Sequence, residues 1–159
     1  MSSEVELFPG HVSRLGLGSI PHADLAERTG LELLRENHMP EELEPFVAEH
    51  HGTTVLSYFY KRALDEGQVE ELNFRYPGPR PSSKESAVLM LADAVESASR
   101  TLTDPTPSSI RSLIDRLVQQ RLQDGQLAEA PLTFDDLEVI ASTFERMLTA
   151  ILHRRISYP

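Results

Sequence analysis

The fold is decided most clearly by residues 133–152, which read TFDDLEVIASTFERMLTAIL. Apolar side chains recur there every three or four positions, the spacing of one face of an α-helix. They are Leu137, Ile140, Ala141, Phe144, Leu148, Ile151 and Leu152. Thr133 and Asp136 stand three residues apart just before this stripe, as in a capping box that begins a helix. The stretch therefore predicts a long amphipathic helix.

The same periodicity returns along most of the chain. A second apolar stripe predicts a helix that Thr106 and Pro107 begin and Gly125 ends. A third helix is expected to begin at the capping box Ser82–Glu85 and to run to about residue 102. No segment alternates with period two for long enough to predict a strand, so the expected class is all-α with about six helices. The second stripe consists of Ile110, Leu113, Ile114, Leu117 and Val118. The remaining helices are predicted at 22–37, at 41–51 with Pro40 at its first turn, and at 54–65.

Length and composition bound the possible functions. The 159 residues suit about one domain of roughly 100–200 residues. The absence of cysteine excludes disulfides, zinc–thiolate sites and cysteine nucleophiles, and agrees with a cytoplasmic location. A net charge of −10 argues against nucleic acid or an anionic membrane as the main partner. The longest apolar run, 87–92, stops at Asp93, well short of the roughly 20 residues of a membrane span. Residues 1–21 are expected to be an irregular lead-in.

Two groups have the chemistry of metal ligands. His50 and His51 are adjacent at the end of a predicted helix, where both rings could reach one metal, although a core histidine beside an exposed one is the plainer interpretation. Asp93 follows the apolar run 87–92 and needs a cation or a metal if it is buried. It needs neither if it lies on the solvated side with Glu96 and Arg100.

A third group is suited to phosphate. Residues 73–84 contain no acid and carry Arg75, Arg80 and Lys84 beside Phe74 and Tyr76. Guanidinium and ammonium groups next to aromatic rings suit a phosphate that is attached to a base. The alternative is a proline-stiffened connector whose charges are solvated.

Three stretches together resemble one protein family. They are HHGTTVLSYFYKRA, FRYPGPRPSSKESAVLMLADAVESASRTL and LHRRISYP. From about Gly30 to Pro159 the chain resembles the C-terminal part of the HD domain of bacterial seven-transmembrane-receptor HD proteins. This resemblance implies a helical, cytoplasmic, metal-dependent phosphodiesterase region that hydrolyses cyclic di-AMP, so residues 22–159 are expected to form a partial HD-like domain.

The resemblance also assigns roles to single residues. It implies that His50 and His51 ligate one ion of a dinuclear iron or manganese centre and that Asp93 ligates the other. Imidazole and carboxylate ligands suit these metals. We further expect Arg75, Arg80 and Lys84 to lie near the phosphates of a cyclic dinucleotide, which is our inference and not part of the family's motifs.

The sequence also departs from the family pattern. It contains no His-Asp dipeptide, which in the family supplies ligands upstream of this region. A further family histidine is replaced by Ala26, and His22, one turn earlier, is a possible substitute ligand. Two hypotheses follow: a piece of an HD phosphohydrolase that works with a missing N-terminal half, or an inactive helical module for interaction or nucleotide sensing, which a homodimer or a partner helix would complete.

Overall fold

The structure is a computed structural model that describes residues 20–103 and 105–153, with side chains for 28–103 and 105–152. Within these residues it contains α-helices, two short 3-10 helices and no β-strand, so the predicted all-α class is confirmed. Two compact units are present, one ending at Pro79 and one beginning at Arg80. The predicted HD-like region 22–159 therefore spans both units. The elements are α2 (Ile20–Glu36), η1 (Glu41–Leu43), α3 (Glu44–Glu49), α4 (Ser57–Glu66), η2 (Glu71–Phe74), α5 (Lys84–Ser99), α6 (Pro107–Gln123) and α7 (Phe134–His153).

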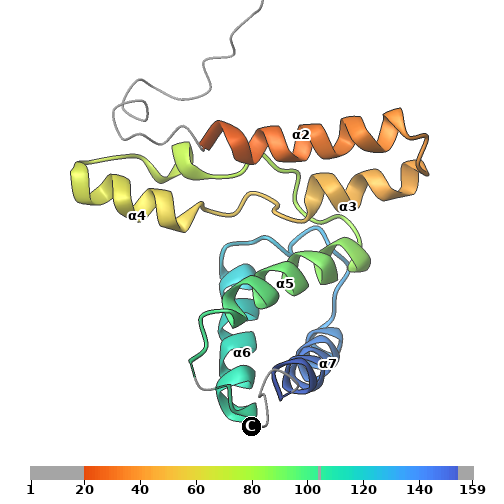
Figure 1. Cartoon of the computed structure of the whole chain (residues 1–159), viewed down its shortest axis with the longest axis vertical. Helices are drawn as coiled ribbons and strands as arrows, with labels where there is room; N and C mark the ends of the chain where they lie inside the picture. The colour runs from red at the N-terminus through yellow and green to blue at the C-terminus, as the bar shows by residue number, and fades with distance from the viewer. Residues whose placement is uncertain (1–19, 104, 154–159) are drawn as a thin grey trace, which may run out of the picture. The chain divides into compact units, whose positions relative to one another are not determined.

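In the first unit, α2 and α3 lie side by side and run in opposite directions (Figure 1). Arg35 at the end of α2 donates two hydrogen bonds to the Glu44 carboxylate at the start of α3, at 2.8 and 2.7 Å. This paired contact raises the pKa of Arg35 and lowers the pKa of Glu44. The two helices are thus joined at one end by a bidentate ion pair.

A small core completes the first unit. Ala63 of α4 and Phe74 of η2 are fully buried, and apolar side chains from the segments around them pack against this pair. Those partly buried neighbours are Val55, Leu56, Phe59, Tyr60 and Val69. Because Phe74 is buried here, the residues that follow it are brought beside the chain that leads into α4.

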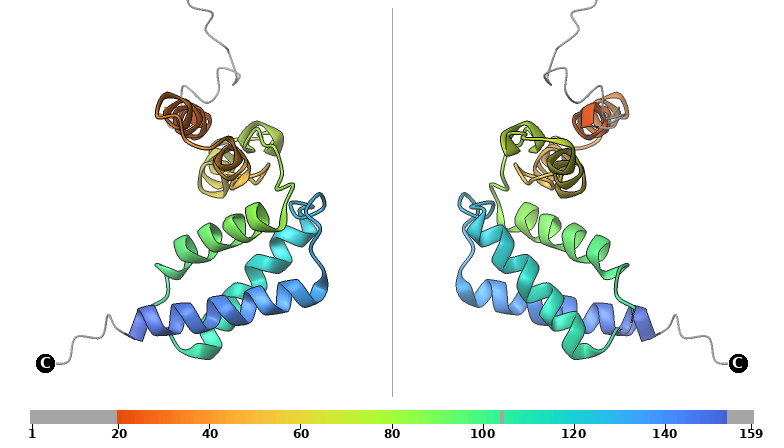
Figure 2. Two further views of the ribbon diagram at one scale, coloured as in Figure 1. Left: turned by 90° about the vertical axis from the view of Figure 1, so that its right-hand side faces the viewer. Right: turned by 90° about the vertical axis from the view of Figure 1, so that its left-hand side faces the viewer.

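The second unit is built from α5, α6 and α7, with α6 packed against both of the others (Figure 2). Its core contains most residues of the two predicted stripes, with Ile110 and Ile114 of α6 fully buried and Leu137 and Leu148 of α7 almost so. Ile151, which the stripe of α7 placed in the core, is instead 48% exposed. α5 contributes Ala87, Met90, Leu91 and Val95. The helical periodicity therefore predicted most of the core of this unit.

Two of the three predicted helix starts in this unit are confirmed, and the third is displaced. The Thr106 hydroxyl accepts from the Ser109 N–H, and the Thr133 hydroxyl accepts from the Asp136 N–H while Asp136 accepts in return from the Thr133 N–H. The cap predicted at Ser82 is instead Ser83, whose hydroxyl accepts from Ser86. Because Ser86 is fully buried, its place in the core fixes where the helix begins.

The helices predicted at 41–51 and 54–65 begin later than expected. Residues 41–43 form a 3-10 turn, and the α-helix starts at Glu44 with Pro45 in its first turn, where a missing N–H costs nothing. α4 starts at Ser57 because residues 54–56 are hydrogen bonded to 74–76 instead. Of the predicted lead-in 1–21, residues 1–19 lie outside the described residues, and α2 begins at Ile20.

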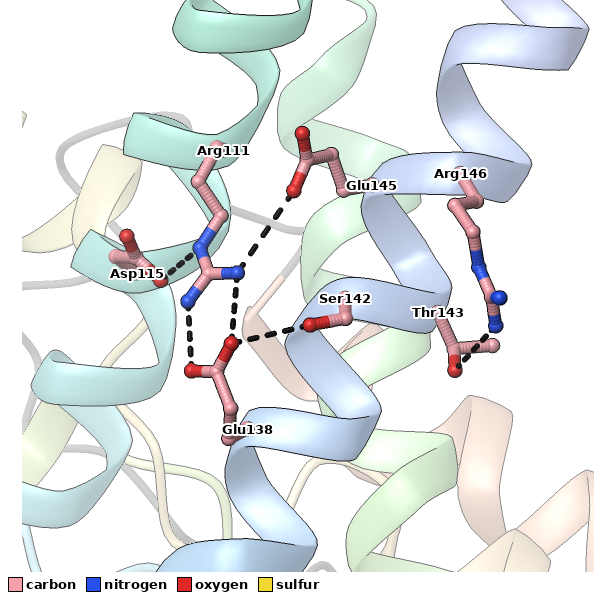
Figure 3. Close-up of polar contacts among 7 residues, drawn as sticks. All are labelled: Arg111, Asp115, Glu138, Ser142, Thr143, Glu145 and Arg146. Atoms are coloured by element: carbon pink, nitrogen blue, oxygen red, sulfur yellow. Dashed lines mark hydrogen bonds and ion pairs between the residues drawn. The ribbon is translucent and has the colours of Figure 1, made fainter.

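A charged cluster ties α6 to α7 (Figure 3). The Arg111 guanidinium donates to Asp115 at 2.8 Å and to both carboxylate oxygens of Glu138 at 3.0 and 2.7 Å, and it lies 3.7 Å from Glu145. Glu138 also accepts from the Ser142 hydroxyl at 3.0 Å. These contacts lower the pKa of Glu138, with Arg111 as the largest cause, and raise that of Arg111.

In the described part of the chain no helix is both long and apolar enough to span a bilayer.

Candidate metal and phosphate site

His50 and His51 lie where α3 ends. His50 is the C-cap residue of this helix, and Gly52 follows with a φ of 57°, a left-handed conformation that glycine adopts at little cost. The Gly52 N–H donates to the Glu49 carbonyl at 2.9 Å, and the Thr54 hydroxyl donates to the His51 carbonyl at 2.9 Å. A tight turn therefore fixes the backbone on both sides of the histidine pair.

One hydrogen bond sets the orientation of the His50 ring. Its Nδ1 lies 2.8 Å from the carbonyl oxygen of Val47. Since a carbonyl oxygen can only accept, Nδ1 carries the proton, and in the neutral ring Nε2 is the nitrogen that can bind a metal. Metal-binding histidines in proteins are typically held in this way by a backbone carbonyl or a carboxylate on the other nitrogen.

The two imidazole rings and Tyr76 are in successive contact. The ring centres of His50 and His51 are 3.9 Å apart, with 39° between the ring planes. The Tyr76 ring stacks on His51 at 4.3 Å and 29°. All three side chains are partly exposed. Neither histidine ring is fully buried, so the interpretation of the pair as a core histidine beside an exposed one does not describe this structure.

Asp93 lies in α5, on the second unit, and its side chain is exposed. Its environment is nevertheless not purely solvent, because its charge acts on Arg121 of α6. Burial lowers the pKa of the Arg121 guanidinium, while the carboxylates of Asp124 and Asp93 oppose that shift. The structure therefore gives Asp93 a cationic neighbour other than Arg100, which pairs with Glu96 at 2.9 Å.

Two of the three predicted phosphate contacts are engaged with carboxylates. Arg75 donates to Glu71 at 2.7 Å and to the Thr53 carbonyl at 2.8 Å, and Lys84 donates to Asp136 at 2.7 Å. Arg80 lies beside Gly125, where a methyl group would come within 3.9 Å of Nη1. The boundary between the two units falls within the acid-free stretch 73–84, so that stretch is also a connector.

The donor set fits part of a metal centre. Neutral imidazoles suit divalent first-row metals, and the His50 ring is oriented as a ligand would be. Among the described side chains, however, no group of three or more histidine, aspartate and glutamate residues is gathered so that it could hold an ion. His50 and His51 belong to the first unit and Asp93 to the second. The side chain of His22 lies outside the described residues.

The sequence connected Tyr76 with the cations of 73–84 and not with the histidines, and it did not single out Arg121. The stacking of Tyr76 on His51 depends on the pairing of residues 54–56 with 74–76, which no local sequence pattern predicts. Arg121 could have been found, because it stands at i+3 from Val118 and i+7 from Ile114 and so occupies the next position of a buried stripe. Its Nε is buried without a hydrogen-bond partner among the described residues.

Comparison with known proteins agrees with the sequence resemblance. No protein-family model matches the chain. The cyclic-di-AMP phosphodiesterase PgpH of Bacillus subtilis is 44% identical over 131 residues, which are 82% of this chain and 18% of that protein. The Listeria monocytogenes protein of the same name is 41% identical over 133 residues, 83% of this chain and 18% of its own length. The chain thus spans less than a fifth of these relatives.

Solved structures give the same result for the fold. The crystal structure of the L. monocytogenes PgpH HD domain matches with a TM-score of 0.74 and 39% identity, over 80% of this chain and 60% of that one. The complex of that domain with cyclic-di-AMP matches with a TM-score of 0.75 and 39% identity, over 79% and 59%. The chain is homologous to a C-terminal portion of the PgpH HD domain.

Proposed function

We propose that this chain is the C-terminal region of a metal-dependent HD phosphodiesterase that acts on a cyclic dinucleotide of the cyclic di-AMP type. The observation that carries the proposal is the histidine pair, with the His50 Nδ1 proton directed at the Val47 carbonyl and Nε2 left for a metal. The 41–44% identity to cyclic-di-AMP phosphodiesterases supports the substrate class. The cytoplasmic location expected from the resemblance is part of the same proposal.

In this proposal His50, His51 and Asp93 contribute ligands to a centre of iron or manganese, metals that accept imidazole and carboxylate ligands together. When bound, such ions polarise a phosphodiester and activate water at neutral pH. The role of the protein is to hold the imidazoles in place and to present the exposed Asp93 carboxyl group on α5. In this structure Arg75 and Lys84 bind carboxylates. Arg80 stays in the proposal as a contact to a substrate phosphate because it belongs to the acid-free stretch 73–84.

We propose further that the chain by itself hydrolyses poorly. The HD dyad that would add ligands does not occur in its 159 residues, and the chain matches only 60% of the solved HD domain. An incomplete ligand set binds metal weakly, because the binding free energy grows with every ligand that the fold holds in place. A partner that supplies the remaining ligands would restore the activity.

The test is hydrolysis of cyclic di-AMP by the purified chain in the presence of Mn²⁺ or Fe²⁺, compared with the His50→Ala variant and with a mixture of the chain and an HD-dyad-containing N-terminal fragment of a PgpH relative. We expect turnover by the chain near the variant's background and an increase in the mixture that needs His50. Robust hydrolysis by the chain alone would contradict the impairment, and a mixture in which His50→Ala is harmless would contradict the metal role.

A second candidate is an inactive helical module for interaction or nucleotide sensing. It is favoured by the exposed apolar side chains of α7, because Val139, Met147 and Ile151 are spaced by multiples of four residues and are between 48% and 66% exposed. This function predicts binding of cyclic di-AMP or self-association, without hydrolysis in the mixture described above. Calorimetry with the nucleotide and sedimentation at several protein concentrations would detect it.

A further inference from the structure

We propose that Arg75 and Tyr76 are positioning residues for the His50–His51 pair, a role that rests on the proposed metal function. Both belong to the short segment 74–76 that follows η2, and both contact the turn 51–54 that carries the second histidine. Neither residue is needed to touch substrate or metal in this role. They act by fixing where the imidazole nitrogens point.

The segment 74–76 is paired with the chain that follows the histidines. The Leu56 N–H donates to the Phe74 carbonyl at 2.7 Å, and the Tyr76 N–H donates to the Thr54 carbonyl at 3.0 Å. Between these bonds Val55 and Arg75 form an isolated antiparallel bridge. Buried Phe74 anchors this segment in the small core of the first unit. The pairing therefore fixes the turn after His51 relative to the small core of the first unit.

The Arg75 side chain adds a second connection to the same turn. Its Nη1 donates to the Thr53 carbonyl at 2.8 Å, while Nε and Nη2 donate to Glu71 at 3.1 and 2.7 Å. The side chain is 23% exposed. A guanidinium held on one side by a carboxylate and on the other by a backbone carbonyl is rigid, because all of these bonds must break together for it to move. Arg75 is thus built to hold the turn and not to capture a passing phosphate.

Tyr76 acts on the ring itself. It stacks on His51 at 4.3 Å, and His51 in turn lies 3.9 Å from His50. A stack of this kind restricts the rotation of the imidazole about its side-chain bonds. Since a metal site tolerates only small errors in ligand direction, fixing His51 before the metal arrives lowers the cost of binding. Tyr76 would thereby do for His51 what the Val47 carbonyl does for His50.

The experiment uses the full chain and follows the ring protons of His50 and His51 by NMR, first without metal and then during titration with Mn²⁺, whose unpaired electrons broaden the signals of its ligands. The variants are Tyr76→Leu, Tyr76→Phe, Arg75→Ala and Arg75→Lys. Matched controls are Tyr58→Leu, a tyrosine that is 69% exposed, and Arg62→Ala, an arginine paired only loosely with Glu66 at 4.0 Å. Thermal unfolding of every variant reports whether it folds.

We expect Tyr76→Leu to shift the His51 signals without metal and to weaken Mn²⁺ binding by roughly tenfold, the usual scale for a residue that orients a ligand. Tyr76→Phe keeps the stack and should behave like the wild type. Arg75→Ala should weaken Mn²⁺ binding, and Arg75→Lys should recover only part of the loss because an ammonium cannot make the same set of bonds. Both controls should leave both readouts unchanged.

Folded Tyr76→Leu with His51 signals and Mn²⁺ midpoint as in the wild type would overturn the role of Tyr76. A folded Arg75→Ala variant that keeps its Mn²⁺ midpoint but loses affinity for cyclic di-AMP would overturn the role of Arg75 and return it to the phosphate. Wild-type chain whose histidine signals are not broadened by Mn²⁺ would contradict the proposed metal function. In that case the metal-independent shift of His51 still decides whether Tyr76 orients the ring.

Discussion

Gly30 of α2 lies directly against Val47 of α3, so closely that a methyl group on Gly30 would stand 2.8 Å from Val47 Cγ1. A glycine inside a helix lowers its stability by propensity alone. In the structure Gly30 is the position that lets the two helices approach. Val47 in turn presents the carbonyl that orients His50. The glycine is therefore connected to the candidate metal ligand through one residue.

We predict that Gly30→Ala lowers the stability of the chain. Alanine gains about 1 kcal/mol in helix propensity, but overpacking against a stiff, β-branched valine costs roughly 1–3 kcal/mol. The expected net loss is about 1 kcal/mol in the free energy of unfolding, measured by urea denaturation. Gly67→Ala, where a methyl group meets nothing within 4 Å, is the control. Val47→Ala in the Gly30→Ala background should recover part of the loss, and a Gly30→Ala chain as stable as the wild type would refute the close contact.

A second prediction concerns acid stability. Asp136 has a pKa lowered to about 2, chiefly by the hydrogen bond from Lys84 and then by the Thr133 N–H and hydroxyl. A carboxyl whose pKa is lower in the folded than in the unfolded chain stabilises the fold above its ordinary pKa, and this contribution is lost as the pH falls toward 2. We expect the stability difference between the wild type and Asp136→Asn to be full at pH 5 and to shrink between pH 4 and pH 2.

The measurement is urea denaturation of both proteins at a series of pH values. Asp135→Asn, at the neighbouring exposed position of the first turn, removes the same charge without removing the cap and serves as the control. A stability difference that stays constant from pH 5 to pH 2 would show that Asp136 does not titrate as the contacts require.

The third prediction tests the charged cluster between α6 and α7. Arg111→Met should lower the free energy of unfolding by about 1 kcal/mol, because three carboxylates lose their shared cation and a bidentate bond is broken. Raising the salt concentration should reduce the loss. Arg100→Met, which breaks only an exposed pair with Glu96, should cost less. A double-mutant cycle with Glu138→Gln that gives no coupling would contradict the contact in Figure 3.

Much of the fold could be predicted because it is written in local patterns. The stripes at 110–118 and 137–152 have the helical period, and Thr106 and Thr133 start their helices through bonds to residues three positions ahead. The displaced start of α4 could not be predicted in this way. It depends on bonds between residues about twenty positions apart, such as Tyr76 to Thr54, and periodicity carries no information on such pairs.

In the candidate site, too, the residue types could be predicted from the sequence, but the contacts between distant residues could not. His50 and His51 could be proposed as ligands from the sequence because their chemistry is visible there and a resemblance assigns them a role. What orients them was not found, since the contacts of Val47, Arg75 and Tyr76 arise only when the turn at Gly52 and the segment 74–76 come together. For the cations of 73–84 the sequence suggested a function but not their contacts. The net positive charge of this stretch suggested phosphate binding, whereas the carboxylates that Arg75 and Lys84 contact, Glu71 and Asp136, lie outside the stretch.

The most direct test of the central claim is the metal content of the purified chain after anaerobic loading with Fe²⁺ or Mn²⁺ and removal of unbound ions, measured by mass spectrometry together with cyclic di-AMP hydrolysis. We predict incomplete metal retention, which falls to background in His50→Ala and in His51→Ala and is accompanied by little turnover. Retention that is unchanged in both histidine variants, or a full complement of metal with rapid hydrolysis by the chain alone, would contradict this account.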